Sequence, residues 1–272
     1  MNWDTVLELT QRMMQQVGAN LMQDFEQVLQ GRFTSTSIKD DGSVVTQADK
    51  QADRDLRSAI AAVFPEHGVL SEELGQTYGG AEWCWVIDPL DGTNNFARGV
   101  PIWDISVGLL YHGTPVFGCV YAPMLRQLFW GFWPGETGLA MPTGAFLNGR
   151  PLTLQAEATS RTHFYSFCSR SWQLLPPDWT GKGRALGAAA YNLVLVAAGV
   201  YLAAVEASPK VWDIAAAWPI CLAAGATWQP LHSYAMFPLM AQRDYSDVGC
   251  PTLATIRRRS RSRWSRSSPH YA

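Results

Sequence analysis

The stretch Trp85-Val86-Ile87-Asp88-Pro89-Leu90-Asp91-Gly92-Thr93-Asn94-Asn95-Phe96 decides how the rest of the chain is interpreted. Bulky and β-branched residues from Trp83 to Ile87 predict a buried strand. Asp88 is expected to end this strand, because Pro89 cannot donate the next hydrogen bond of a sheet. The turn at Gly92-Thr93-Asn94 then predicts a helix start with exposed backbone N–H groups. Two carboxylates are therefore predicted beside a helix N-terminus.

These two carboxylates, those of Asp88 and Asp91, suit a hard divalent cation, and the helix N-terminus suits a phosphate group. A strand that simply ends in a turn is the alternative, and an isolated D-P-x-D pattern is compatible with either interpretation. The full D-P-L-D-G-T-N-N-F string is harder to explain as a turn alone. A site for metal ions and phosphate is therefore the favoured hypothesis.

This string resembles the first signature motif of the inositol monophosphatase family, which contains magnesium-dependent, lithium-sensitive phosphatases of sugar phosphates. W-D-I-A-A-A, which begins at Trp212, resembles the second motif of the family. The resemblance covers roughly residues 5–255. It implies a fold of the α/β class with α+β layering. The implied architecture is a five-layer α/β/α/β/α sandwich, with the site between its two halves. Residues 1–180 would form the half with the main metal motif, and residues 181–256 the half with the second motif.

Five ligand positions follow from the resemblance. From the residues alone, Glu72 is one of two acids in a solvated loop, and Asp213 is an acid at the favourable start of a helix. The family has a metal-binding glutamate in G-E-E, where this chain has S-E-E beginning at Ser71. Crowded carboxylates without cations would repel one another, which also favours a metal cluster. The resemblance implies two or three Mg²⁺ ions, held by Glu72, Asp88, the carbonyl oxygen of Leu90, Asp91 and Asp213.

Three residues are candidates for catalysis. The pattern from Thr46 to Asp49 predicts a capped helix start, and from the residues alone Asp49 is a cap. The resemblance implies a second role, in which Asp49 and Thr93 orient the attacking water and Glu72 assists. Lys39 matches a lysine of the family with a one-residue difference in spacing, so its role stays open.

Small residues from Gly187 to Ala189 permit either tight packing or the close approach of a ligand to the backbone. The family has G-x-A at this place, and an acid that contacts substrate hydroxyl groups at the place of Glu206. The substrate-binding residues implied by the resemblance are Asp91, Gly92, Thr93, Gly187, Ala189, Glu206 and Asp213.

The composition is that of a globular chain with an unusual end. Its 272 residues are 47% hydrophobic and 16% charged, which allows a large core and excludes general disorder. Six arginines lie within residues 257–272, and without them the 15 remaining basic residues face 23 acidic ones, a net charge of −8. An acidic body fits a cation site better than a nucleic-acid surface. The Arg/Ser run is typical of a disordered tail, for which a weak nucleic-acid role stays open.

The sequence also predicts the compartment. Five cysteines without a C-x-x-C pair predict buried thiols in a reducing environment. No basic and apolar leader follows Met1, so a cytoplasmic location is expected. The uncharged run from Ala185 to Val205 has the length of a membrane span. Its alanines and glycines and Asn192 instead favour a buried helix followed by a strand.

Periodicity predicts the remaining elements. We expect His67 to be solvated in a loop, and no pair of histidines has the spacing of zinc ligands. The other expected features are a helix over residues 4–30, a helix from Thr46 that Pro65 ends, an antiparallel meander from Asp104 to Trp133, a hairpin turn at Asn148-Gly149, a helix from Asp213 to Gly225 and a last strand over residues 252–256.

The resemblance therefore implies a Mg²⁺-dependent phosphomonoesterase that hydrolyses inositol monophosphate, and that is a homodimer away from membranes. Relatives with the same metal motifs leave histidinol phosphate, fructose 1,6-bisphosphate and 3′-phosphoadenosine 5′-phosphate open as substrates. A catalytically idle binding protein is the alternative from another class. The oxygen ligands retained at all metal positions argue against it.

Overall fold

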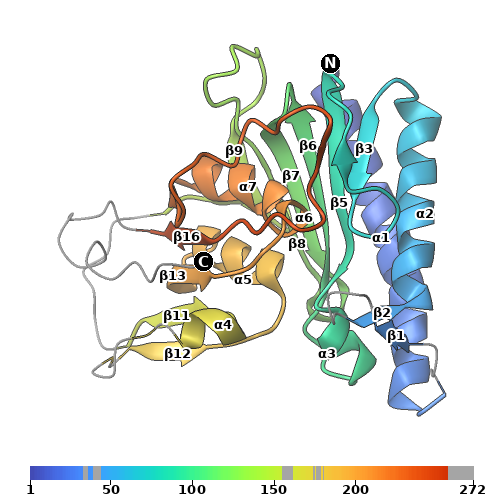
Figure 1. Cartoon of the computed structure of the whole chain (residues 1–272), viewed down its shortest axis with the longest axis vertical. Coiled ribbons are helices and arrows are strands. Elements are labelled where there is room, and N and C mark those ends of the chain that lie inside the picture. Colours follow the sequence, from blue (N-terminus) through green and yellow to red (C-terminus); the bar gives the residue numbers. More distant parts are fainter. Residues whose placement is uncertain are drawn as a thin grey trace.

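The computed structural model describes residues 1–32, 36–38, 44–154, 162–173, 175, 179 and 181–256, so Lys39 and the Arg/Ser tail lie outside the described residues. Helices and sheets alternate in layers (Figure 1). Helices α1 (Trp3–Leu29) and α2 (Gln47–Val63) cover one face of a seven-stranded sheet. Between this sheet and a five-stranded sheet lie α5 (Ala189–Ala197), α6 (Val211–Ala215) and α7 (Ala217–Ala224). The predicted α/β class is confirmed.

The two large sheets are both mixed. The first has the strand order β10 (Arg150–Leu152), β9 (Gly144–Leu147), β8 (Gln127–Phe132), β7 (Thr114–Ala122), β6 (Asp104–Tyr111), β5 (Trp83–Asp91) and β3 (Gly68–Ser71). The second has the order β12 (Lys182–Arg184), β11 (Phe164–Phe167), β13 (Tyr201–Glu206), β16 (Thr252–Thr255) and β14 (Thr227–Pro230). Smaller elements are β1 (Thr36–Ile38) with β2 (Val44–Thr46), β4 (Thr77–Tyr78) with β15 (Arg243–Asp244), α3 (Thr93–Ala97), α4 (Ser169–Trp172) and the 3₁₀ turn Pro123–Leu125.

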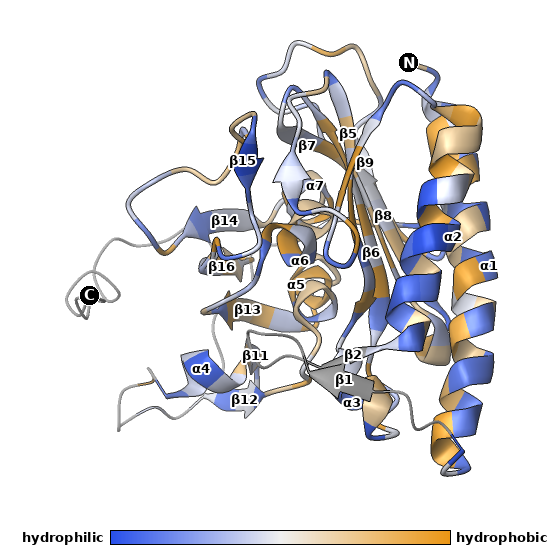
Figure 2. Ribbon diagram, turned by 45° about the vertical axis from the view of Figure 1, so that its right-hand side comes forward, coloured by the Kyte–Doolittle hydropathy of each residue, from blue (hydrophilic) through white to orange (hydrophobic). Residues whose placement is uncertain are grey.

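Strand β5 is buried on both faces. Trp85 and Ile87 pack in the core formed with α1 and α2, whereas Cys84 and Val86 pack in the core formed with α5, α6 and α7. Along α1 and α2, hydrophobic and hydrophilic residues alternate in stripes, as expected for helices with one buried face (Figure 2). Because side chains alternate along a strand, those of the even-numbered residues of β5 up to Asp88 point toward α5, α6 and α7, the middle helices between the two large sheets.

A bulge corrects the expectation that Asp88 ends this strand. The strand continues to Asp91, and its partners on β6 are Ser106 for Asp88 and Asp104 for Asp91. Three steps along β5 therefore oppose two steps along β6, so β5 contains one extra residue. Pro89 is tolerated there because a bulge interrupts the hydrogen-bond ladder. The extra residue turns Asp91 onto the same face as Asp88, toward the middle helices.

Most of the other predicted elements are confirmed, with two corrections. The helix predicted from Asp213 to Gly225 is divided into α6 and α7, since Pro219 removes an N–H donor and crowds the preceding turn. His67 is not simply solvated, because its Nδ1 accepts a hydrogen bond from Trp85 Nε1 at 3.1 Å and its ring stacks on Phe64. Burial lowers the pKa of His67, which favours the neutral ring that can accept this bond.

The uncharged run from Ala185 to Val205 forms α5 and most of β13, as predicted. Among the described residues, no helix combines the length and the apolar character needed to cross a membrane. The division into halves near residue 180 stays a prediction, and β11 before that point already belongs to the five-stranded sheet.

Two glycines bring α6 and α7 close to the first sheet. A Cβ atom on Gly108 of β6 would lie 2.9 Å from the carbonyl carbon of Ala215, and one on Gly118 of β7 only 2.0 Å from the carbonyl oxygen of Ala216. Only residues without a side chain allow this contact. The contact in turn places the start of α6, which carries Asp213, against the end of β5.

We expect Gly118→Ala to lower the free energy of unfolding by about 3 kcal/mol, the upper range for overpacking of a core, because a backbone oxygen cannot move aside easily. Chemical denaturation measures this change. Gly79→Ala is the matched control, since its new methyl group would meet no atom within 4 Å. Equal stability of the two variants would contradict the close packing of α7 on β7.

Candidate active site

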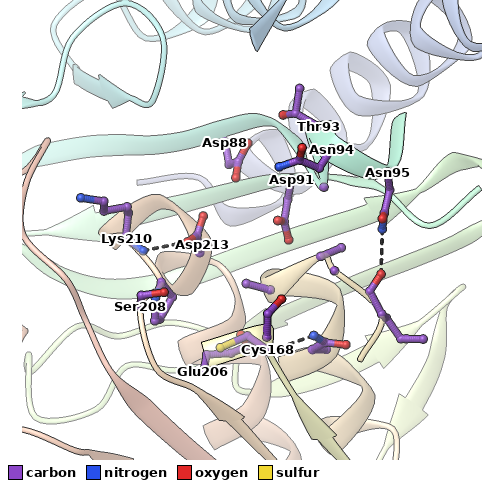
Figure 3. Close-up of a pocket in the computed structure, with 18 of the residues that line it drawn as sticks. Asp88, Asp91, Thr93, Asn94, Asn95, Cys168, Glu206, Ser208, Lys210 and Asp213 are labelled. Atoms are coloured by element: carbon purple, nitrogen blue, oxygen red, sulfur yellow. Dashed lines mark hydrogen bonds between the residues drawn. The ribbon is translucent and has the colours of Figure 1, made fainter. Parts of the chain in front are cut away.

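A cavity of about 660 Å³ opens where the end of β5 meets the starts of α5 and α6. All but one of the residues predicted from the sequence line it, and Asp49 lies just behind it, bound to Thr93. The predicted residues that line the cavity are Glu72, Asp88, Leu90, Asp91, Gly92, Thr93, Gly187, Ala189, Glu206 and Asp213. In Figure 3, Asp88 and Asp91 project from one side and Asp213 from the other.

Three carboxylates form the centre of this cavity. Asp88, Asp91 and Asp213 each place an oxygen atom so that these atoms all lie within 4.8 Å of one another. The bulge in β5 directs the first two toward α6. Asp213 is fixed at the third position of α6, because its Oδ2 accepts a hydrogen bond from the N–H of Lys210 at 2.7 Å. Hard oxygen donors in this arrangement suit Mg²⁺ or Ca²⁺.

Burial and mutual repulsion raise the pKa of all three carboxyl groups. For Asp88 and Asp213, burial is the largest cause and the charges of neighbouring acids add to it, so both pKa values lie well above the usual range. Burial also raises the pKa of Asp91, to about 6, against the hydrogen bond that its Oδ2 accepts from the N–H of Ala190 at 2.7 Å. A divalent cation at this place would relieve the repulsion, so the donor set fits a metal ion chemically.

Glu72 and Leu90 complete the predicted ligand set around the three carboxylates. Glu72 follows β3, its N–H donates to the carbonyl of Ile87 at 3.2 Å, and its charge raises the pKa of Asp88 and Asp213. Leu90 is fixed at the bulge, because its N–H donates to Asp88 Oδ1 at 3.0 Å. The carbonyl of Leu90 is 2.9 Å from Thr93 Oγ. That carbonyl oxygen has a second lone pair for another partner.

Asp49 connects the start of α2 to the cavity. Its Oδ2 accepts hydrogen bonds from both the N–H and the hydroxyl of Thr46, which completes the predicted capping box. Its Oδ1 lies 2.9 Å from the hydroxyl oxygen of Thr93. Asp49 is only 1% exposed, and burial raises its pKa against these hydrogen bonds. Asp49 therefore uses its Oδ2 to cap α2, while its Oδ1 faces Thr93, as the predicted role in orienting water requires.

The far side of the cavity is polar and partly buried. Glu206, at the end of β13, accepts a hydrogen bond from Asn192 Nδ2 at 2.9 Å, and burial raises its pKa well above the usual range. Gly187 has a φ of 81°, and a Cβ there would lie 3.0 Å from Asn95 Nδ2. The backbone and Asn95 thus require glycine at this point, whatever ligand approaches it.

Some residues of the cavity were not found from the sequence. Cys168 was predicted to be a buried thiol, but it is half-buried and lines the cavity beside Glu206 (Figure 3). Burial alone would raise its pKa, yet hydrogen bonds from Ser171 and from the N–H of Ala207 lower it below the usual value. Asp104 does not line the cavity, but it pairs with Asp91 across β5 and β6, and an acid at the start of an apolar strand was its one signal in the sequence.

The comparisons with known proteins agree with this geometry. The model of the inositol monophosphatase family matches residues 2–250. A fructose-1,6-bisphosphatase/inositol-1-monophosphatase of Aquifex aeolicus is 34% identical over 212 residues, which cover 73% of this chain and 77% of the relative. A histidinol-phosphatase of Chlorobaculum parvum is 33% identical over 196 residues, which cover 69% and 72% of the two chains.

A solved structure extends the similarity to the fold. The Thermotoga maritima IMPase superposes with a TM-score of 0.75 at 26% identity, and the match covers 93% of this chain and 92% of that one. The family model spans nearly the whole chain, and the two relatives are identical to it at about a third of the aligned residues. The chain therefore belongs to the inositol monophosphatase family and is a phosphoric monoester hydrolase.

Proposed function

We propose that this phosphatase hydrolyses inositol monophosphate to inositol and phosphate, with Mg²⁺ as cofactor and water as the attacking group. One observation supports this best: the oxygen atoms of Asp88, Asp91 and Asp213, within 4.8 Å of one another, lie in a cavity that Thr93 also lines, and Asp49 is bound to Thr93 just behind it. Binding groups for cations and a hydroxyl that could orient water therefore face the same space.

Five residues are the proposed ligands of the metal ions. Glu72, Asp88, the carbonyl of Leu90, Asp91 and Asp213 would hold the two or three Mg²⁺ ions. When bound, the ions would activate water and neutralise charge that develops on the phosphate oxygens. The crowding of acids at the floor of the cavity is then an advantage, because it concentrates negative charge where cations are needed.

Thr93 would align the attacking water. Its hydroxyl oxygen is 2.9 Å from both Asp49 Oδ1 and the carbonyl of Leu90. A hydroxyl has one proton to donate and two lone pairs with which to accept, so Thr93 can pass a hydrogen bond from water to Asp49. Thr46 holds Asp49 in place, and Glu72, whose charge contributes to the raised pKa of Asp49, would be a further acid beside the water.

Substrate groups would be bound on both sides of the scissile bond. The N–H groups of Gly92 and Thr93, at the start of α3, would bind phosphate oxygens, because the Gly92 φ of 88° begins a turn that exposes them. Glu206 and the small residues Gly187 and Ala189 would face the alcohol part. A carboxyl group with a raised pKa can both donate to and accept from hydroxyl groups, which suits a polyol.

Other phosphomonoesters stay alternatives to inositol monophosphate. Histidinol phosphate and fructose 1,6-bisphosphate are supported by the names of the two relatives above, and 3′-phosphoadenosine 5′-phosphate by the resemblance of the metal motifs. Lithium sensitivity, a homodimer and a cytoplasmic location are likewise parts of this proposal. The polar side of the cavity, with Glu206 and Asn192, favours the polyol.

The purified chain should release phosphate from inositol monophosphate faster than from these three competitors, with Mg²⁺ required and Li⁺ inhibiting.

We expect Asp91→Asn to abolish turnover, because it removes a proposed metal ligand. The variant should leave the metal-free fold intact, because it also removes repulsion between the clustered carboxylates. Phosphate release and circular dichroism measure the two effects. Asp55→Asn, on α2 and outside the cavity, is the control. Near-normal turnover of Asp91→Asn at saturating Mg²⁺ would refute the metal assignment.

Thr93→Ala should lower kcat by roughly 10²–10⁴-fold, the usual contribution of positioned acid–base assistance, while cation binding survives. Asp49→Asn should cause a similar loss. Because the two residues act as a unit, the double variant should be little worse than either single variant. Steady-state kinetics and a cation titration of each protein test this. The control is Thr137→Ala, whose hydroxyl bonds to Pro134 in a turn outside the cavity. Fully multiplicative losses would show that Thr93 and Asp49 act separately.

A further inference from the structure

Asn192 is a polar side chain within an apolar helix. It lies on α5 and is 0% exposed. Its neighbours along the helix belong to the hydrophobic core between the two large sheets: Ala190, Leu193, Val194 and Val196. Removing an amide group from water costs free energy unless hydrogen bonds replace the lost hydration. An apolar residue would pack at this position without that cost, so packing alone does not account for the amide.

The hydrogen bonds of Asn192 are incomplete. Its Nδ2 donates to Glu206 Oε1 at 2.9 Å, across from α5 to the end of β13 (Figure 3). Among the described residues, no group donates to its Oδ1, although that atom is buried. A buried acceptor without a donor destabilises a protein. The chain therefore keeps a partly satisfied amide, and the contact that this amide provides is the bond to Glu206.

Glu206 is held at the wall of the cavity, where it is only 2% exposed. Its neighbours there include Asn192 and Cys168. The sulfur atom of Cys168 already accepts hydrogen bonds from the N–H groups of Ser171 and Ala207, so the backbone sets its position. Asn192 supplies the donor that fixes Glu206 Oε1. A carboxyl group has further lone pairs, so Glu206 can still bond a ligand in the cavity.

An oriented carboxyl group can select the ligand that faces it. It can accept a hydrogen bond from a hydroxyl group of a substrate. A site of this kind discriminates against molecules that lack the hydroxyl group, because its own buried polar groups are then left unpaired. The cluster of Asp88, Asp91 and Asp213 lies on another side of the same cavity (Figure 3). The phosphate part and the alcohol part of a substrate would therefore meet different residues.

We propose that Asn192 is a positioning residue for substrate selection: its Nδ2 fixes the orientation of Glu206, whose carboxyl group then bonds a hydroxyl group on the alcohol part of the phosphomonoester. This inference rests on the proposed function, since it takes Glu206 as the residue that meets the alcohol part. It assigns part of the selectivity to an amide that acts through Glu206. The amide therefore matters for polyol phosphates and not for phosphomonoesters without a hydroxyl group.

Asn192→Leu tests the proposal, because leucine suits the apolar surroundings and cannot donate to Glu206. The two probes are inositol monophosphate and p-nitrophenyl phosphate, whose alcohol part carries no further hydroxyl group. For inositol monophosphate we expect KM to rise about tenfold, which corresponds to about 1.4 kcal/mol, with kcat nearly unchanged, because the lost binding is common to the ground state and the transition state. For p-nitrophenyl phosphate both constants should stay the same. Equal losses for the two substrates, or no loss for either, would overturn the proposal.

A double-variant cycle tests whether Asn192 acts through Glu206. In a Glu206→Leu background, Asn192→Leu should cause no further rise of KM for inositol monophosphate, because the group that it positions is already absent. A second rise that multiplies the first would contradict the proposal. Asn192→Ala, which is too small to overpack α5, should repeat the kinetics of Asn192→Leu, and circular dichroism checks that each variant is folded.

Asn148→Leu is the matched control. The amide of Asn148 is bonded at both ends, since its Oδ1 accepts from the N–H of Leu128 and its Nδ2 donates to the carbonyl of Arg126, outside the cavity. Its loss should lower stability and leave the kinetics with both substrates unchanged. Inactivity of the unmodified protein toward inositol monophosphate would refute the proposed function. Glycerol 2-phosphate, which also carries hydroxyl groups, would then test the role of Asn192 by the same comparison.

Discussion

Carboxylates that are held close together and away from water repel one another, and the site is built around this repulsion. At an effective dielectric constant of about 20, two charges 4 Å apart interact by about 4 kcal/mol. Asp88, Asp91 and Asp213 approach one another within 4.8 Å, and two of them are less than a tenth exposed. The chain tolerates the arrangement through a few backbone donors, such as the N–H groups of Lys210 and Ala190. The cations proposed for this site would compensate for the rest of the repulsion.

The framework that holds these acids was largely predictable, because its signals are local. The alternation from Trp83 to Ile87 predicts the buried strand β5. The spacing of Thr46 and Asp49 predicts the capping box of α2, and Gly225 predicts the end of α7. Each of these rests on residues within a few positions of one another. The motif around Asp88 predicted an acidic cavity, and the structure brings together the residues that the resemblance named. Their individual roles stay predictions.

What escaped prediction depends on residues that are far apart in the sequence. The bulge in β5 is visible only once β6 is paired with it, because Asp91 could otherwise be assigned to either face. The same pairing alone places Asp104 behind Asp91. His67 and Cys168 were misjudged for a similar reason, since their partners Trp85 and Ala207 lie 18 and 39 positions away. Local patterns predict elements, whereas the register between elements determines which polar groups meet.

The hydrogen bond from the N–H of Ala190 to Asp91 joins residues 99 positions apart. Asp213 likewise reaches the cluster from α6, which follows a strand of the five-stranded sheet, whereas Asp88 and Asp91 belong to the seven-stranded sheet. A cation held by all three would act as a crosslink between segments that otherwise meet through apolar packing and a few hydrogen bonds. Divalent ion concentration would then determine how cooperatively the two sheets unfold, so that the ion is part of the mechanical integrity of the molecule.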